Sequence, residues 1–327
     1  MFSELFGPDA KANQNRWSRS PDNPVIRSAG SGWADDFIAP SAVVEWEGQL
    51  RLYVEGSAGG HEQIGLFTAA TAEHDVGDWA SSPANPVVRL GDGFDKGGVF
   101  DPAVVEFKGR WFLYHSATEG DAHAFAEQLA LGTAGDDEPS DETIGLATSE
   151  DGEVFTKHPG GPVLRARCPF AVVHDGQVYL FHVRVHAGGY RIHLAVSDDG
   201  VDFRPATDVP VIEVGEPGSW DSFSLTTPKV FRDGDQFCMS FAGDNTGLDD
   251  PTGIGLAFSD DLMTWEKVAG NPVFKTGGPG SFDSVSVASP VIRRVGDRYY
   301  MWYAGSDRAI GDGLHSQVGL AWMPAIR

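Results

Sequence analysis

The sequence has little cysteine, no long apolar run and no leader pattern. Its two cysteines, Cys168 and Cys238, lie in apolar segments without the spacing of metal ligands, which predicts buried reduced thiols. No stretch approaches the roughly 18 apolar residues that span a membrane. The opening residues, MFSELFGPDAKANQNRW, have neither a basic nor an apolar leader region. We therefore expect a soluble, cytoplasmic protein.

Positive charge is also scarce. Lys and Arg number 24 against 47 Asp and Glu, so the formal net charge is -23. Association with a nucleic-acid backbone or an anionic membrane would work against Coulomb repulsion. These partners are excluded, and a small-molecule partner is expected. The oligomeric state is left open.

Glycine, proline and short apolar runs are abundant instead. The chain of 327 residues contains 41 Gly and 20 Pro, and its composition does not break at any point. Such punctuation is typical of many short strands rather than long helices. We expect one all-β domain over residues 1–327.

A repeated signature runs along the chain, in which an aromatic residue precedes an Asn/Gly-Pro-Val element by six positions. Its five copies are Trp17 with Asn23-Pro24-Val25, Trp79 with Asn85-Pro86-Val87, Phe155 with Gly161-Pro162-Val163, Phe203 with Val209-Pro210-Val211, and Trp265 with Asn271-Pro272-Val273. After each copy, a Pro-apolar run, a Gly turn and an aromatic-rich run predict a β-hairpin. A third strand such as IGLATS follows in most copies, and the next aromatic begins a fourth.

Four antiparallel strands in each of five units predict a five-bladed β-propeller. The chain ends support this. Trp17 has no hairpin before it, and the last unit stops after its third strand at VGLAWMPAIR. The N-terminal segment should therefore supply the outer strand of the last blade and close the ring.

Antiparallel strands sort the charged residues between two faces. The turns at 149–152, 197–200 and 259–262 fall on one face as turn formers. The other face receives the connections between blades and the loops between second and third strands. Its ionisable residues are Asp35, Asp36, Asp95, Asp101, Asp221 and Asp283 in the connections, and Glu55, His61, His115, Glu119, Arg184, His186, Asp244, Asp307 and Arg308 in the loops. We expect the site in the central depression of this face.

Departures from the repeat localise the site further. Asp101 precedes the inner-strand Pro where the other blades have Ala39, Cys168, Thr227 and Ser289. The third connection is short, and the second blade carries an inserted loop at about 116–143, whose AHAFAEQLAL section favours a short helix. We interpret the insertion as a rim, a lid or an oligomer contact.

The repeat resembles the five-bladed propeller glycoside hydrolases: the arabinanases and xylosidases of family 43, the invertases and levansucrases, and the mannoside phosphorylases of family 130. The resemblance runs from Trp17 to Met323. It implies an inner-strand Asp as base or nucleophile, a second Asp in an Asp-Pro pair, and a Glu as general acid. Asp101-Pro102 matches the Asp-Pro pair.

The other two positions depart from the pattern. Ala39 aligns with the first-blade Asp, so Asp35 or Asp36 would have to serve. Arg167-Cys168-Pro169 stands where invertases have Glu-Cys-Pro, and the arabinanase-like position is Thr226 or Ala288. A histidine is a possible proton donor because its pKa lies near working pH.

The leading hypothesis is a glycosidase acting on a small, furanose-containing oligosaccharide. Asp36 or Asp35 would be the base, Asp101 the orienting carboxylate, and His115, His186 or Glu119 the acid. The candidate substrate-binding residues are Trp33, Phe100, Arg167, Arg184, His186, Asp221, Asp283 and Arg308. For Asp221 and Asp283, recurrence in two blades favours a structural role.

Two other functions stay open. A phosphorylase would use Arg184, His186 and Arg308 to bind phosphate. A non-catalytic sugar-binding propeller would need no acid at all. No cofactor is predicted, although a structural calcium ion held by Asp oxygens is compatible with the excess of acids.

Overall fold

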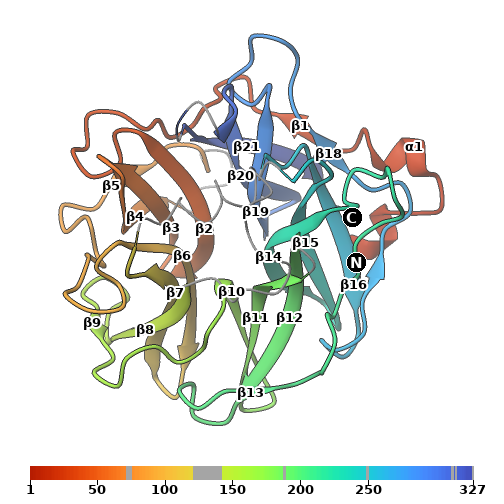
Figure 1. Cartoon of the computed structure of the whole chain (residues 1–327). Helices are drawn as coiled ribbons and strands as arrows, with labels where there is room; N and C mark the ends of the chain where they lie inside the picture. The colour runs from red at the N-terminus through yellow and green to blue at the C-terminus, as the bar shows by residue number, and fades with distance from the viewer. Residues whose placement is uncertain are drawn as a thin grey trace.

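The sequence repeat corresponds to five antiparallel sheets arranged around a central axis (Figure 1). The computed structural model describes residues 1–70, 76–120, 142–186, 189–247, 250–310, 313 and 315–325. The fold is a five-bladed β-propeller, as the repeat predicts. Most of the inserted loop, with its predicted helix, lies outside the described residues.

Each blade is ordered from the axis outward. The first blade contains β2 (Phe37–Trp46), β3 (Gln49–Ala58), β4 (His61–Ala70) and β5 (Ala80–Ser81), and the second contains β6 (Gly98–Phe107), β7 (Arg110–Thr118), β8 (Thr143–Ser149) and β9 (Thr156–Lys157). The third blade contains β10 (Arg167–His174), β11 (Gln177–His186), β12 (Gly189–Ser197) and β13 (Arg204–Pro205), and the fourth contains β14 (Ser224–Asp233), β15 (Gln236–Asp244), β16 (Gly253–Ser259) and β17 (Glu266–Lys267), with β18 (Phe274–Lys275) also paired to β16. The fifth blade contains β19 (Ser286–Val295), β20 (Arg298–Ser306), β21 (Gln317–Pro324) and β1 (Ser18–Arg19).

The ring closes through the N-terminal strand. Ser18 and Arg19 of β1 pair with Trp322 and Ala321 of β21, so the first strand of the chain completes the last blade. A 3-10 helix (Phe2–Leu5) and helix α1 (Ala10–Asn13) precede it on the periphery (Figure 1). The predicted closure is confirmed, and it joins the two ends of the chain within one blade.

The Asn of the Asn-Pro-Val element is a structural clamp. In the fourth blade, the Asn271 side chain accepts a hydrogen bond from the Leu256 N–H at 3.0 Å and donates one to the Leu256 carbonyl at 2.9 Å. Asn85 and Asn23 do the same for Leu66 and Leu320. In these three blades, one Asn side chain therefore satisfies both the N–H and the carbonyl of a third-strand leucine, which gives the repeated Asn a structural role.

Replacing Asn271 by Ala should lower the free energy of unfolding by about 1–3 kcal/mol, because the Leu256 backbone loses a donor and an acceptor in a partly buried place. Denaturant unfolding measures this. The exposed Asn15, whose side chain donates to the Lys11 carbonyl, provides a control. N15A should stay within about 0.5 kcal/mol of the parent protein, and an equal loss in both variants would contradict the clamp.

The turns between third and fourth strands confirm their predicted structural role. Asp151 accepts backbone hydrogen bonds from Glu153 and Val154, and Ser149 accepts one from Gly152. The same pattern recurs around Asp199 and Asp261. These carboxylates close their own turns and lie away from the axis.

A β-bulge interrupts each first strand near the axis. In four blades the bulged residue has a positive φ: Asp101 (50°), Cys168 (47°), Thr227 (48°) and Ser289 (49°). A non-glycine residue rarely adopts this conformation, so its recurrence marks a position that the fold imposes. In three blades the N–H of this residue donates to a side chain of a neighbouring blade: Asp101 to Glu55, Cys168 to Ser116 and Ser289 to Thr227.

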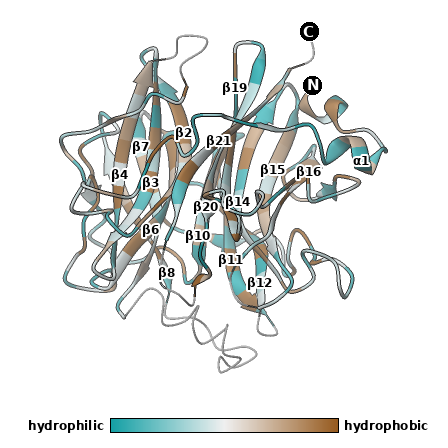
Figure 2. Ribbon diagram, turned by 90° about the horizontal axis from the view of Figure 1, so that it is seen from above, coloured by the Kyte–Doolittle hydropathy of each residue, from teal (hydrophilic) through white to brown (hydrophobic). Residues whose placement is uncertain are grey.

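The apolar core lies between blades. In Figure 2, apolar and hydrophilic residues alternate along the strands. Trp46 and Trp111 meet edge to face at 5.0 Å between the first two blades. No helix in the described part of the chain is long and apolar enough to cross a membrane.

Candidate functional site

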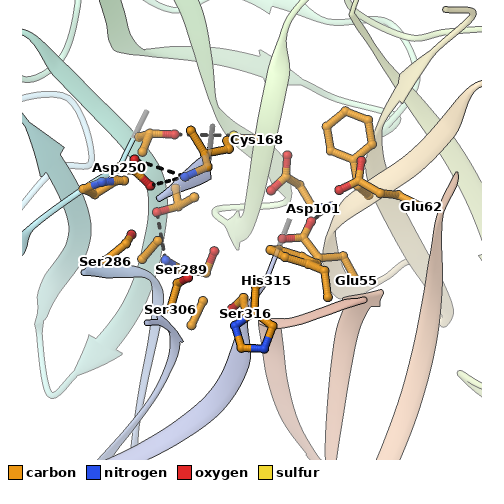
Figure 3. Close-up of a pocket in the computed structure, with 18 of the residues that line it drawn as sticks. Glu55, Glu62, Asp101, Cys168, Asp250, Ser286, Ser289, Ser306, His315 and Ser316 are labelled. Atoms are coloured by element: carbon orange, nitrogen blue, oxygen red, sulfur yellow. Dashed lines mark hydrogen bonds between the residues drawn. The ribbon is translucent and has the colours of Figure 1, made fainter. Parts of the chain in front are cut away.

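A cavity of about 140 Å³ lies at the axis, where loops meet the ends of the first strands. Figure 3 shows Glu55, Glu62 and Asp101 together on one side of it, with Asp250 and several serines on the other. Glu55, Glu62 and Asp101 come from second, third and first strands of the first two blades, and Asp250 lies between β15 and β16 of the fourth. The propeller thus gathers acids that lie far apart in the sequence.

Glu55 places a carboxyl group of the first blade at the axis. It lies on β3, directly across the strand pair from the fully buried Ala39 of β2. The small side chain of Ala39 leaves space at the axis, and the Glu55 carboxyl occupies the axial end of the blade from the second strand. The register shows Ala39 equivalent to Phe100, so Pro40 rather than Ala39 matches Asp101 in space.

Burial sets the protonation of Glu55. Its side chain is only 5% exposed, and its Oε2 accepts a hydrogen bond of 2.6 Å from the Asp101 N–H. Desolvation, followed by the neighbouring Asp101 charge, raises the pKa of Glu55 to about 8. Glu55 therefore holds a proton at neutral pH inside a solvent-accessible cavity.

Asp101 links three blades. Its N–H donates to Glu55, and its Oδ2 accepts a 2.8 Å hydrogen bond from the Ser116 hydroxyl. Ser116 in turn accepts a 2.8 Å hydrogen bond from the Cys168 N–H. Ser116 holds the register position of Glu55 one blade further on, so both side chains receive the N–H that the next bulge turns outward.

Arg167 replaces the expected acid with a cation. Its Nη1 donates to the Tyr190 hydroxyl at 2.6 Å, and its Nε lies 3.4 Å from Oε2 of the buried Glu142. Glu62, on β4, has a pKa raised well above its ordinary value, first by burial and then by the Glu55 charge. The third blade thus contributes positive charge beside Glu55, Glu62 and Asp101 of the first two blades.

The opposite wall is rich in hydroxyls. Asp250 accepts hydrogen bonds from the Ile310 N–H at 3.0 and 3.2 Å. The hydroxyl-bearing residues that line the cavity are Thr226, Thr227, Ser286, Ser289, Ser306 and Ser316. Arg308 and His315 also line it, and both face Asp307. Hydroxyl and carboxylate groups of this kind suit the hydrogen bonding of a sugar.

Four of the predicted site residues line the cavity: Phe100, Asp101, Arg167 and Arg308. The predicted bases do not. Asp35 and Asp36 are exposed in the connection before β2, where Asp35 accepts from the N–H groups of Ser31 and Gly32, and Asp36 from that of Gly59. These backbone hydrogen bonds lower the pKa of Asp35 and shape the loop.

The candidate proton donors also lie elsewhere. His115 is fully buried, and burial lowers its pKa to about 4, so it is neutral at neutral pH. Glu119 is exposed and forms a 2.6 Å ion pair with Lys96. Arg184 and His186 are exposed near the end of β11. None of these four side chains is among the cavity residues.

Asp221 and Asp283 hold connections in place. Asp221 pairs with Lys267 at 2.6 Å, and Asp283 pairs with Arg19 at 2.7 Å. Both carboxylates are buried and belong to the fourth and fifth blades. Their aromatic neighbours pack over third-strand glycines, as Trp33 does in the first blade, where a Cβ at Gly65 would lie 2.2 Å from its ring. These contacts match the structural role that their recurrence favours.

Several cavity residues escape sequence reasoning. Glu62 and Asp250 stand in no repeated motif, and Glu55 is one among many loop acids. The available signal was the second-strand register, because the positions equivalent to Glu55 hold only Ser116, Val183, Ala242 and Ala304. Among the described residues, no group of three or more His, Cys, Asp or Glu side chains is placed to hold a metal ion.

Fold and site together define a five-bladed propeller with a buried acid cluster at its axis. No family model matches the chain. It is 26% identical over 247 residues to the uncharacterized protein Rv1502 of Mycobacterium tuberculosis (strain ATCC 25618 / H37Rv), which covers 72% of this chain and 76% of that protein.

Solved propellers share the architecture. The protein BT0996, in a complex with RGII, aligns over 98% of this chain and 98% of its own length with a TM-score of 0.69 and 13% identity. A structure from the GH130 family of mannoside phosphorylases, which contains glycoside hydrolases that target β-1,2 mannosidic linkages in Candida mannan, aligns over 95% of this chain and 96% of its own length with a TM-score of 0.69 and 15% identity. The chain therefore has the fold of these proteins.

Proposed function

We propose that the protein is a glycoside hydrolase that cleaves a small oligosaccharide or glycoside by acid/base catalysis in the axial cavity. One observation carries this proposal: a carboxyl group that keeps its proton at neutral pH, Glu55, lines a cavity that also contains carboxylates and hydroxyls. Glycosidic cleavage needs a proton donor and a second carboxylate.

In the proposed reaction, Glu55 donates its proton to the leaving oxygen as the glycosidic C–O bond breaks. Asp250, on the facing wall, accepts a proton from the water whose oxygen forms the new bond to the anomeric carbon. Asp101 stabilises the positive charge that develops on the sugar ring. Proton exchange with solvent then restores Glu55 and Asp250. Asp250 replaces Asp35 and Asp36 as the proposed base, because it lines the cavity and they do not.

The proposed substrate is a small sugar. Phe37 and Phe100 provide apolar surface, and Ser289 and Ser306 provide hydroxyl contacts. The glycoside hydrolases among the structural neighbours support this ligand class. A furanose unit follows from the resemblance to the arabinanases and invertases, and it belongs to the proposal.

The second candidate is a phosphorylase. Arg308 and the serines at the mouth of the cavity offer donors for inorganic phosphate, which would replace water as the nucleophile. The mannoside phosphorylase family of one structural neighbour favours the same alternative. Arg184 and His186, the other predicted phosphate ligands, lie outside the cavity residues.

A screen of aryl glycosides and short oligosaccharides, with and without phosphate, tests the proposal. We expect cleavage that does not depend on phosphate and releases the free sugar. Release of a sugar 1-phosphate only when phosphate is present would establish the second candidate. Calorimetric binding of a sugar with no cleavage on long incubation would contradict both and identify a non-catalytic sugar-binding propeller.

A further inference from the structure

Lys229 is a charged residue at the axis where the repeat otherwise has apolar side chains. It lies on β14, directly after the bulge at Thr227 and Pro228. Its register places it with one residue in each other first strand. These are Ala42, Ala103, Phe170 and Val291. Because the other four blades have apolar side chains at this position, the fold itself does not require a charge there.

The lysine is buried without a hydrogen bond. It is 2% exposed, and its Nζ has no hydrogen-bond partner among the described residues. The ring of Phe170 lies 5.6 Å from Nζ and provides a cation–π contact. Burial lowers the pKa of Lys229, and the neighbouring Asp101, Cys168 and Glu55 oppose this shift because their negative charges favour the ammonium form. Desolvation of an ammonium is costly, so its charge interacts strongly with these neighbours.

The charges of the cluster explain what the lysine does. Four carboxyl groups, from Glu55, Glu62, Asp101 and Glu142, interact with two cations, Arg167 and Lys229. Two cations neutralise two carboxylates, and the other two carboxyls are most stable when protonated. The pKa values of Glu55 and Glu62 are raised, in both cases first by burial. Lys229 interacts with Glu55 and Asp101, whereas Arg167 interacts with Glu55, Glu62 and Glu142.

We propose that Lys229 is a positioning residue whose buried ammonium balances the charge of Asp101 and so determines how firmly Glu55 holds its proton. The ammonium opposes proton retention by Glu55, since it favours the ionised carboxylate. Without it, Glu55 should keep its proton to higher pH. The inference rests on the proposed function only for its kinetic readout, because the titration of Glu55 needs no substrate.

Lys229→Met tests the inference, since Met has a similar volume and no charge. The Glu55 carboxyl is followed by carbon NMR of protein labelled in glutamate carboxyl groups, and the spectrum of E55Q identifies its signal. We expect the Glu55 midpoint to rise from about 8 by about one pH unit or more. The descending limb of the pH–rate profile should move upward by the same amount. An unchanged midpoint would overturn the inference.

Two further variants make the result specific. Lys108→Met removes the same charge at the exposed hairpin turn after β6, where Nζ donates to the Asp198 carbonyl at 2.9 Å, and should leave the midpoint unchanged. Lys229→Gln repeats the measurement in case the Met variant fails to fold. A shifted midpoint in a protein that cleaves no glycoside would refute the proposed hydrolase and keep the role of Lys229. A shift as large in K108M would refute that role.

Discussion

Glu55→Gln is expected to lower kcat/KM for an oligosaccharide by about 10²–10⁴-fold, the contribution of a positioned general acid. Gln keeps an oxygen that can accept the hydrogen bond from the Asp101 N–H, and it removes the transferable proton. The loss should shrink for nitrophenyl glycosides, whose leaving group needs little protonation. Steady-state kinetics with paired good and poor leaving groups measures this, and an equal loss for both would contradict the acid role.

The same variant should be more stable than the parent at alkaline pH. A glutamate in the unfolded chain has a pKa of about 4.3, whereas burial raises the pKa of Glu55 to about 8 in the folded protein. Between these values the folded state binds more protons, so the parent loses stability as pH rises. E55Q does not titrate and should gain about 2–4 kcal/mol relative to the parent as pH rises through this range. Denaturant unfolding at pH 5 and pH 8 measures the difference, and equal pH dependence in both proteins would contradict a buried, protonated Glu55.

Asp101→Asn is the second change with a large expected effect. Asn tolerates the positive φ of 50° at this position and can keep the contact with Ser116, so the fold should persist. The charge that stabilises the developing positive sugar ring is removed, and kcat should fall about 10²-fold or more. Because this charge does not protonate the leaving group, the loss should be similar for good and poor leaving groups.

Asp35→Asn and Asp36→Asn are matched controls for the same charge change. Both carboxylates are exposed and bond to backbone N–H groups of their loop. Each variant should retain kcat within about twofold of the parent, because neither carboxylate lines the cavity. The fold should persist as well, since a surface substitution usually changes the free energy of unfolding by at most about 0.5 kcal/mol. A loss in D36N or D35N that matches D101N would instead support the base assignment made from sequence.

The fold could be predicted from sequence because its determinants are local and repeated. Each Asn-Pro-Val element clamps a leucine in its own blade, as Asn85 does for Leu66, and each Ser-Asp turn closes on itself. Ring closure followed from the incomplete units at the two ends of the chain. Each of the five copies therefore predicts the same strand arrangement independently.

The site could be predicted only in part because its geometry depends on register across strands. Asp101 stood out beside a repeated Pro, and it does reach the cavity. Glu55 reaches the axis because Ala39, its cross-strand partner, is small. Lys229 is one residue beyond the repeated Pro, and only the bulge places it beside the acids. The alternation of residues along one strand does not show which residues lie opposite each other on neighbouring strands or where a bulge falls.

Parallel assays of the parent protein, E55Q and D101N on one panel of glycosides and short oligosaccharides test the central claim most directly. The parent should release free sugar without phosphate, with a rate that falls as pH rises through about 8. E55Q should lose this descending limb together with its activity on poor leaving groups. Cleavage by E55Q equal to the parent, across the panel and up to high pH, would show that the axial acid cluster is not the catalytic centre.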